Sequence, residues 1–378
     1  MKLNSYDEWS PLREIVLGSA ANYTSHARDL SFDLFFQDNV TRAHSYYPRV
    51  SAPSRQGADA APRSPIKQRY VDELNEDVEG IAKVLESLGV TVHRPMTLHE
   101  ETTDIVALSW TATVLPPLNL RDNTLILGDE IIETPPMLRA RYVETQFLAP
   151  VFAEYFRQGA RWTVMPRPLL TDASFDTSYT DRSVGNTELA GAPEPSPYDV
   201  GHEIMIDAAQ CLRLGRDLVV NIATANHALA CDWLERHLAG RYRVHRMHRL
   251  TANHIDSMVL ALRPGTLLVR HAGVADFLPE RLRTWDMIIA PEPDESSFPE
   301  YDDDDLILTS PYIDLNVLSV DQDTVLVNEA CPQLMRTLER HGFTSVPVRH
   351  RHRRLFGGGL HCFTLDTVRD GGPEDYLG

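Results

Sequence analysis

The sequence contains almost no lysine. Among its 378 residues lysine occurs only at Lys2, Lys67 and Lys83, so arginine carries nearly all of the positive charge. Positive charge is also in the minority, because 54 acidic residues against 36 Lys and Arg give a formal net charge of −18. Binding to nucleic-acid phosphates requires clustered basic side chains. The sequence therefore predicts no nucleic-acid partner, and its acidic field favours cationic small substrates.

Long apolar runs and cysteine motifs are absent as well. No apolar run approaches the roughly 18 residues of a membrane span, and residues 1–8 are too polar to resemble a signal peptide. The four cysteines, Cys211, Cys231, Cys331 and Cys362, have a spacing that fits no metal motif. We therefore expect a reduced, cytoplasmic enzyme with no membrane partner and no bound metal.

Short apolar segments recur along the chain in three kinds. One kind is rich in β-branched residues or leucine and is bounded by Gly, Asp or Asn, which is typical of strands; these segments are 12–18, 124–129, 217–221, 266–270 and 324–328. Each is followed by a helical pattern, such as 71–88 with Gly89 as its stop. A second strand is then expected at 90–95, 159–166, 240–245, 285–291 and 342–348. A third kind opens each unit, near 112–115, 207–212, 256–262, 315–320 and 362–365.

This recurrence predicts an α/β fold of five repeats in a single domain over residues 1–378. Repeats that cannot bury their own apolar face gain a shared core by circular stacking, so we expect a closed ring. Residues 51–65 and 172–197 interrupt the pattern and are typical of surface loops. The acidic run at 302–305 is typical of a solvated turn, with a metal site as the alternative.

Polar residues stand where the opening strands begin. In a ring of repeats equivalent strand ends meet, so these residues are expected to be neighbours: Asp122, Asp207, His254, Asp256, Asp314 and Cys362. A thiol, an imidazole and several carboxylates form a set for nucleophilic catalysis.

Each member of this set is ambiguous by itself. Cys362 alone is typical of a buried core thiol, although the glycines at 357–359 give the preceding loop the freedom to present a nucleophile. His254 alone is typical of a surface or structural histidine. Since adjacent strand residues point to opposite faces, we interpret His361 as structural and His254 as the partner of Cys362.

Several motifs resemble those of the amidinotransferases, a family with the pentein (α/β-propeller) fold that includes glycine and inosamine-phosphate amidinotransferases. The most specific are Gly-Gly-Gly-Leu-His-Cys at 357–362, His-Ile-Asp at 254–256, and the segments 207–209, 215–217, 128–133 and 139–141. The resemblance covers nearly the whole chain except the stretch at 51–65. It implies five pseudo-symmetric ββαβ repeats around a central active site.

The resemblance also implies a mechanism. Cys362 would be the nucleophile that takes the amidino group of L-arginine, His254 would be the general acid and base, and Asp207 would hold His254. L-Ornithine would leave, and a primary amine would then accept the amidino group in a ping-pong reaction. No metal or organic cofactor is implied. Asp122 would bind the guanidinium together with Asp207, and Asp256 and Arg141 would contact the substrate.

Some positions depart from the glycine-specific branch of the family. Glycine amidinotransferases carry a carboxylate-binding arginine where this sequence has Gly273, and Arg270 is near but not aligned. Asp314 stands where those enzymes have a serine, and a carboxylate there would suit a cationic or polyhydroxylated substrate. We therefore expect an acceptor other than glycine, with aminocyclitols, lysine-like amines and amines of specialised metabolism all open.

Three alternatives to this function remain open. A guanidine hydrolase such as an arginine deiminase would use nearly the same residues but would pass the intermediate to water. A glycine amidinotransferase proper is the second. A non-catalytic binding module is the third, and it would be expected to lack one of Cys362, His254 or Asp207, all of which are present. The oligomeric state is open, and edge surfaces and long loops are compatible with a homodimer.

Overall fold

The computed structural model describes most of the chain. The described residues are 1–23, 29–41 (backbone alone from 36), 66–98, 104–178, 198, 200, 202–251, 254–301, 306 and 308–378. The predicted loop at 51–65, the acidic run at 302–305 and most of the predicted loop at 172–197 lie outside these residues. Within them, no helix is both long and apolar enough to cross a membrane.

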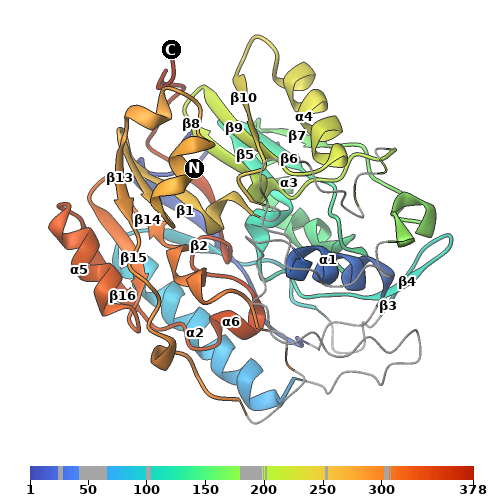
Figure 1. Cartoon of the computed structure of the whole chain (residues 1–378), viewed down its shortest axis with the longest axis horizontal. Helices are drawn as coiled ribbons and strands as arrows, with labels where there is room; N and C mark the ends of the chain where they lie inside the picture. The colour runs from blue at the N-terminus through green and yellow to red at the C-terminus, as the bar shows by residue number, and fades with distance from the viewer. Residues whose placement is uncertain are drawn as a thin grey trace.

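The described strands form five three-stranded sheets and one two-stranded hairpin (Figure 1). In strand order the sheets are β17 (Thr364–Arg369), β1 (Leu12–Leu17) and β2 (Thr91–His93); β5 (Thr124–Leu127), β6 (Glu130–Glu133) and β7 (Arg161–Val164); β8 (Cys211–Leu214), β9 (Asp217–Ile222) and β10 (Arg243–His248); β11 (Val259–Arg263), β12 (Thr266–Val269) and β13 (Asp286–Ile289); β14 (Leu318–Ser319), β15 (Thr324–Asn328) and β16 (Thr344–Val348). In every sheet the middle strand pairs antiparallel with the first strand and parallel with the third. The predicted α/β class is confirmed, with mixed sheets.

Helices connect the parallel strands, as a parallel crossover requires. The described helices are α1 (Leu30–Thr41), α2 (Gln68–Ser87), α3 (Ala149–Arg157), α4 (Ala225–Leu238), α5 (Pro332–Arg340) and α6 (Arg353–Phe356). Five of them, α1 to α5, lie in the chain between a middle strand and its parallel partner, and α1 and α2 share the connection from β1 to β2. The connection from β12 to β13 instead has two short 3-10 turns, η8 (Ala272–Asp276) and η9 (Leu282–Thr284). Gly273 and Pro279 in this segment both disfavour a longer helix.

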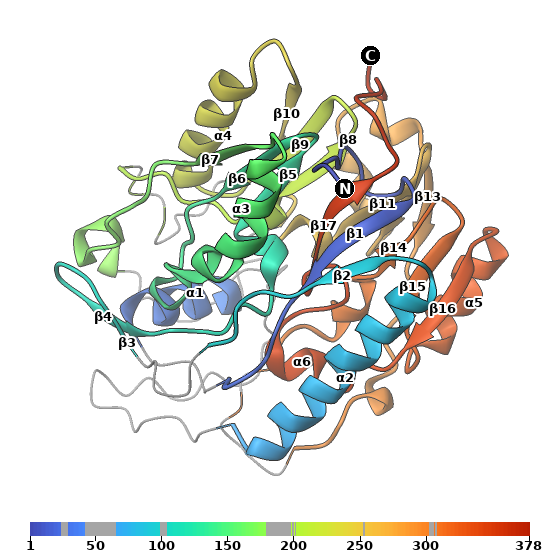
Figure 2. The same ribbon diagram turned by 180° about the vertical axis from the view of Figure 1, so that it is seen from behind.

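One strand assignment from the sequence is wrong. The segment 124–129, predicted to be a middle strand, contains β5, the first strand of its sheet, because Gly128 at φ +59° allows a tight turn that folds β6 back onto β5. β6, not β5, is therefore the middle strand of its sheet. The predicted opening strand at 112–115 is β4 (Thr111–Thr113), which pairs with β3 (Asp104–Val106) in a hairpin that projects from the five sheets (Figure 2).

A short 3-10 turn precedes the first strand of four sheets. These turns are η1 (Leu120–Asp122), η6 (Ala208–Gln210), η7 (Ile255–Ser257) and η11 (Pro311–Leu315). The turn η1 contacts η6, η6 contacts η7, and η7 contacts η11. Polar residues at the start of separate sheets are therefore gathered by a chain of adjacent turns. In the remaining sheet β17 begins at Thr364, so Cys362 lies in a turn rather than in the predicted strand.

Buried charged side chains link the N-terminal segment to β8 and β17. Arg213 donates to both carboxylate oxygens of Glu8 over 2.8 Å and to Asp366 over 2.7 Å. Arg121 and Arg369 each lie 2.6 Å from Asp366. These five side chains are at most 7% exposed. Because a buried charge is costly unless it is paired, the network depends on all of its members.

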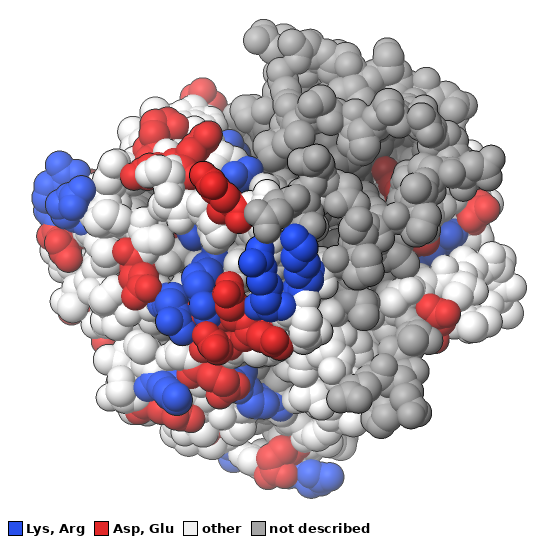
Figure 3. Space-filling view, turned by 90° about the horizontal axis from the view of Figure 1, so that it is seen from below, with Lys and Arg blue, Asp and Glu red and all other residues white. Residues whose placement is uncertain are grey.

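The surface mixes both signs of charge. On the described part of the face in Figure 3, acidic and basic side chains lie next to one another. One such pair joins Glu76 of α2 to Arg351 over 2.9 Å. Exposed pairs of this kind contribute little to stability.

Candidate active site

The glycine loop brings the backbone close to two asparagines. Gly357 has φ +67° and ends α6 in the left-handed region. A Cβ on Gly358 would lie 2.0 Å from Asn119 Oδ1, and a Cβ on Gly359 would lie 2.4 Å from Asn316 Cβ. Both positions therefore require glycine. The close approach lets Asn316 Oδ1 accept the backbone N–H of Cys362 over 2.8 Å, which fixes the thiol's place in the turn.

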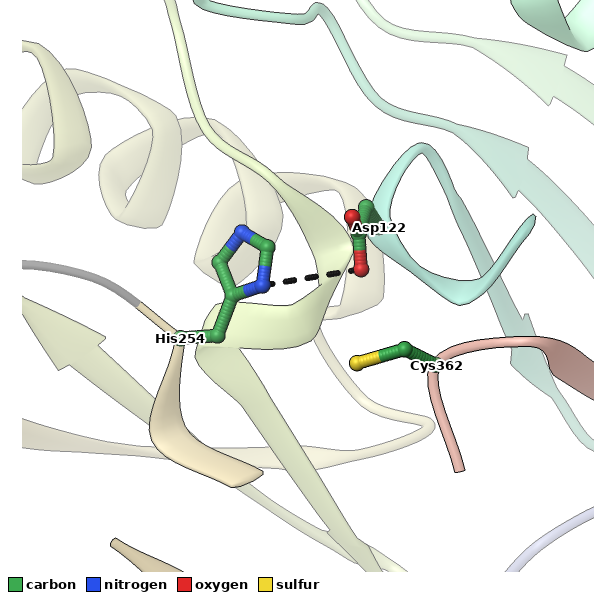
Figure 4. A group of neighbouring side chains, drawn as sticks. All are labelled: Asp122, His254 and Cys362. Atoms are coloured by element: carbon green, nitrogen blue, oxygen red, sulfur yellow. Dashed lines mark ion pairs between the residues drawn. The ribbon is translucent and has the colours of Figure 1, made fainter. Parts of the chain in front are cut away.

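Three side chains converge at this turn. One donor atom from each of Asp122, His254 and Cys362 lies within 4.8 Å of the others, and the three side chains point toward a common space (Figure 4). His254 Nδ1 is 3.6 Å from Asp122 Oδ1, and His254 Nε2 is 2.9 Å from Asp207 Oδ2. All four residues are buried. The structure thus brings together the predicted thiol, its imidazole partner and two of the predicted carboxylates.

Charges around His254 and Cys362 favour a protonated pair. Burial alone would lower the pKa of His254, but Asp122, Asp207 and Asp256 outweigh it and raise that pKa to about 9. Burial raises the pKa of the Cys362 thiol well above its usual range, and the charges of Asp256 and Asp122 raise it further. The resting site therefore holds an imidazolium beside a neutral thiol. A cation that binds between the carboxylates would offset the charge that opposes ionisation of the thiol.

Arg141 supports the carboxylates. Its Nη1 donates to Asp122 Oδ2 over 2.6 Å, its Nη2 donates to Glu144 Oε1 over 2.8 Å, and Nη2 also donates to Asn119 O over 2.8 Å. Burial raises the pKa of Asp122 despite His254 and Arg141, and burial raises the pKa of Glu144 to about 6. In Asp207 burial is outweighed by the hydrogen bond from His254, so its pKa is lowered. Arg141 lines the site, but its donors are directed at these protein groups.

Asp256 meets the thiol from another side. Its Oδ2 lies 3.3 Å from Cys362 Sγ and 2.8 Å from His361 Nδ1. Burial alone would raise its pKa, but the hydrogen bond and charge of His361 outweigh burial and lower the pKa to about 2. The inference that His361 points away from Cys362 is wrong, because the two residues lie in a turn and both approach the same oxygen.

Asp314 is not brought to this cluster. Its Oδ1 lies 2.7 Å from Arg353 Nε and accepts from Asn328 Nδ2 over 3.0 Å. Asp314 also lines a separate cavity of about 50 Å³ with Cys331. The structure therefore surrounds this predicted substrate-binding carboxylate with partners of its own.

Two small cavities adjoin the cluster. One, of about 80 Å³, is lined at its polar end by Asp122, Asp207 and His254. Its apolar wall consists of Tyr23, Phe35, Leu115, Pro116, Leu118, Leu138, Leu355 and Phe356. The other, of about 10 Å³, contains Cys362 together with Arg270 and Tyr312. The Arg270 guanidinium lies 3.9 Å from the centre of the Tyr312 ring and forms no ion pair with the described carboxylates.

The sequence reasoning missed Asn316, Glu144 and the role of Glu8. Glu144 follows Arg141 at a spacing that places the two side chains together, which was a usable signal. Glu8 stands in a polar N-terminal segment, and no local pattern connects it with His361, 353 positions later in the chain. Asn316 has no pattern of its own either, because its role depends on the approach of Gly359.

The cluster of Asp122, His254 and Cys362 contains the donor types of a metal site. An imidazole, a thiol and a carboxylate are ligands that a divalent ion such as zinc prefers. Metal binding requires a neutral imidazole and a thiolate. The surrounding carboxylates instead raise the pKa of His254, and burial together with Asp256 and Asp122 raises the pKa of the Cys362 thiol. These residues therefore fit a metal poorly at neutral pH.

Comparison with known proteins identifies the family. No family model matches the chain. Inosamine-phosphate amidinotransferase 1 of Streptomyces glaucescens is 33% identical over 376 residues, which cover 98% of each chain. The chain belongs to the amidinotransferases. Its resemblance to that family is thereby confirmed.

Other amidinotransferases match over similar lengths. The L-arginine:L-lysine amidinotransferase of Pseudomonas savastanoi pv. phaseolicola is 29% identical over 99% of this chain and 96% of its own. The solved inosamine-phosphate amidinotransferase of Streptomyces griseus superposes with a TM-score of 0.81, at 30% identity over 99% of each chain. A dimethylarginine dimethylaminohydrolase superposes with a TM-score of 0.54 at 12% identity, over 94% of this chain and 99% of its own. This likeness shows the pentein fold alone, which the chain shares with proteins outside the amidinotransferases.

Proposed function

We propose that this amidinotransferase transfers the amidino group of L-arginine through Cys362 to a primary amine other than glycine. The proposal is carried by the buried cluster in which a thiol, an imidazole and carboxylates lie close together. In this cluster Asp122 Oδ1 accepts no hydrogen bond from the described residues. A planar guanidinium offers donors that match carboxylate oxygens. The donor substrate would bring the positive charge that the site lacks.

The first half-reaction follows from the charges. The guanidinium binds between Asp122 and Asp207, near Asp256, and offsets the negative field that keeps the thiol neutral. Cys362 then loses its proton to water, and its thiolate attacks the central guanidinium carbon. The imidazolium of His254 gives its proton to the leaving nitrogen. L-Ornithine departs and an amidino-cysteine remains.

The second half-reaction reverses the proton transfer. An acceptor amine enters the same cavity, and the now neutral His254 takes a proton from it as it attacks the amidino carbon. The bond to Sγ breaks and the new guanidine leaves. These steps use only side chains of this chain, with no metal or organic cofactor. An arginine deiminase would instead release ammonia in the first step and keep the ornithine portion bound to the carbon on Cys362 Sγ. His254 would then activate a water molecule, and citrulline would leave as the Sγ–C bond breaks.

The acceptor is proposed from the cavity. Glycine would require a cation for its carboxylate, and the polar end of the larger cavity carries carboxylates, with Arg141 already bonded to two of them. The apolar wall beyond Asp122 suits an amine with a hydrocarbon body. The Pseudomonas relative is named for an acceptor other than glycine, L-lysine. Asp314 no longer supports this choice, because its contacts lie with Arg353 and Asn328.

The remaining expectations are proposals of the same kind. We propose that the five sheets stand in a ring of pseudo-symmetric repeats, the pentein propeller; their identical strand pairing and the successive contacts of η1, η6, η7 and η11 support this arrangement. Cytoplasmic location and a homodimer stay predictions.

Intact-mass measurement tests the central step. Incubation with L-arginine alone should add the mass of one amidino group to the protein, and Cys362→Ala should not gain it. Cys331→Ala is the matched control, because its thiol lies in the separate cavity near Asp314 and the adduct should persist. A panel of amines then identifies the acceptor by ornithine release. Citrulline without added amine would indicate hydrolysis, and guanidinoacetate formed efficiently from glycine would overturn the proposed acceptor class.

A further inference from the structure

A second histidine lies beside the thiol. The ring of His361 has Nδ1 2.8 Å from Asp256 Oδ2 and Nε2 3.3 Å from Glu8 Oε2. All three side chains are at most 9% exposed. An ionised carboxylate only accepts hydrogen bonds, so a ring that makes both contacts carries a proton on each nitrogen. His361 is therefore a cationic bridge between two buried carboxylates.

The bridge ends on the oxygen that contacts the nucleophile. Asp256 Oδ2, which receives His361 Nδ1, also lies 3.3 Å from Cys362 Sγ. Asp256 is drawn in a second direction as well, because its charge attracts the imidazolium of His254. The side chain of Asp256 thus lies between two cations, and its orientation decides whether Oδ2 faces the thiol.

Glu8 is itself held in place. Arg213 binds both of its oxygens over 2.8 Å, and Arg121 lies 3.4 Å from Oε2. Arg121 also donates from Nε to the backbone carbonyl of His361 over 3.0 Å. The ring and the backbone of His361 are therefore both anchored to the buried charge network. These contacts fix the position of the His361 ring relative to Asp256.

We propose that Glu8 and His361 are positioning residues, which aim Asp256 Oδ2 at the thiol of Cys362. The inference rests on the proposed nucleophilic role of Cys362. Without the bridge, Asp256 turns toward the imidazolium of His254, and the thiol loses the oxygen that orients it. The charged groups that face the bridge are Asp256 and Cys362 on one side and Glu8 with Arg121 and Arg213 on the other.

Two isosteric replacements separate the two ends of the ring. In His361→Asn the amide nitrogen stands near the position of Nδ1 and can still donate to Asp256. In His361→Gln the amide nitrogen stands near the position of Nε2 and can donate only to Glu8. We expect kcat/KM for L-arginine close to wild type in the first variant and about 100-fold lower in the second, the size of loss that a small misplacement of a reacting group produces.

The pH profile distinguishes positioning from loss of structure. His361 is the main group that lowers the pKa of Asp256, while burial raises it. The acid limb of kcat/KM should therefore move to higher pH in His361→Gln and move less in His361→Asn, which keeps the hydrogen bond to Asp256 but not the charge. Thermal unfolding of each variant checks that the fold is retained. Equal activity of the two folded variants, whether both are high or both are low, overturns the proposal.

Alkylation provides a readout that does not need the substrate. The rate of Cys362 modification by iodoacetamide is followed against pH by intact mass. The midpoint should be lower in His361→Gln than in His361→Asn. Both variants lose the charge of the ring, but only in His361→Gln does Asp256, which raises the pKa of the thiol, turn away from Sγ. Unmoved midpoints in both variants contradict the proposal. A wild-type protein that releases no ornithine would sink the proposed function, yet this comparison would still be interpretable.

Discussion

Replacing Asp207 by asparagine should change the ionisation of His254. The isosteric amide keeps an oxygen near His254 Nε2, 2.9 Å away in the native site, but removes the negative charge. The pKa of His254 lies at about 9 instead of its ordinary 6.5, a difference worth about 3 kcal/mol. Among the interactions that raise the pKa of His254, the charge of Asp122 is the largest and the hydrogen bond to Asp207 is the second. A hydrogen bond to a charged group is worth about 1.5 kcal/mol, so the pKa should fall by about one in Asp207→Asn.

Two assays follow the change. The basic limb of kcat/KM for L-arginine, set by loss of the imidazolium acid, should move from about pH 9 toward pH 8. The free energy of unfolding should depend on pH for the same reason. A raised pKa in the folded state stabilises the protein fully below pH 6.5, and that contribution is lost as the pH rises through about 9. Denaturant unfolding should show the variant about 1.5 kcal/mol less stable at pH 6 and nearly equal to wild type at pH 10.

The opposite pattern would refute the reasoning. A basic limb that stays at the wild-type position in a folded, active variant would mean that Asp207 does not hold the imidazolium. A stability difference that grows with pH would mean that the Asp207 carboxylate acts through a partner other than His254. Glu76→Gln is a suitable control, because that carboxylate lies on the exposed face of α2 with its side chain 62% exposed, and its loss should leave both curves unchanged.

Three further predictions concern the loop, the network and metals. Gly359→Ala should lower kcat by about 100-fold, since the new Cβ would meet Asn316 at 2.4 Å, whereas Gly80→Ala, which meets nothing within 4 Å, should leave steady-state turnover unchanged. Arg213→Met should cost about 3–5 kcal/mol in denaturant unfolding, because two buried carboxylates lose their partner; a cost below 1 kcal/mol would show that water replaces the guanidinium. Prolonged treatment with EDTA should leave ornithine release unchanged, and a loss that zinc restores would establish a metal requirement.

Sequence patterns predicted the elements whose signal is local. The strand at 217–221 is β9, a run of buried apolar residues bounded by polar ones, and the helix at 71–88 is α2, whose apolar positions repeat at helical spacing. The strand β6 was not predicted, because Glu130–Glu133 is short and flanked by polar residues, and its pairing depends on the left-handed turn at Gly128.

The site was predictable to a similar depth. The motifs at 254–256 and 357–362 supplied His254 and Cys362, and the structure brings these two side chains together. Contacts that depend on distant segments could not be predicted. The direction of His361 was wrong because a turn rather than a strand carries Cys362. The contacts of Arg141 with Asp122 and Glu144 were not predicted, and its expected contact with substrate stays a prediction.

The pairing of β1 with β17 has a consequence for synthesis. Thr367 of β17 donates to the backbone of Glu14 in β1, 353 residues away. During translation β1 must therefore wait for β17 with one edge unpaired, and an open edge is prone to aggregation. Cys362 immediately precedes β17, so the thiol emerges from the ribosome together with the strand that completes this sheet. A nascent chain that has not reached this point lacks both the Cys362 thiol and a closed first sheet, and it should depend on chaperones more than a chain of the same size with local contacts.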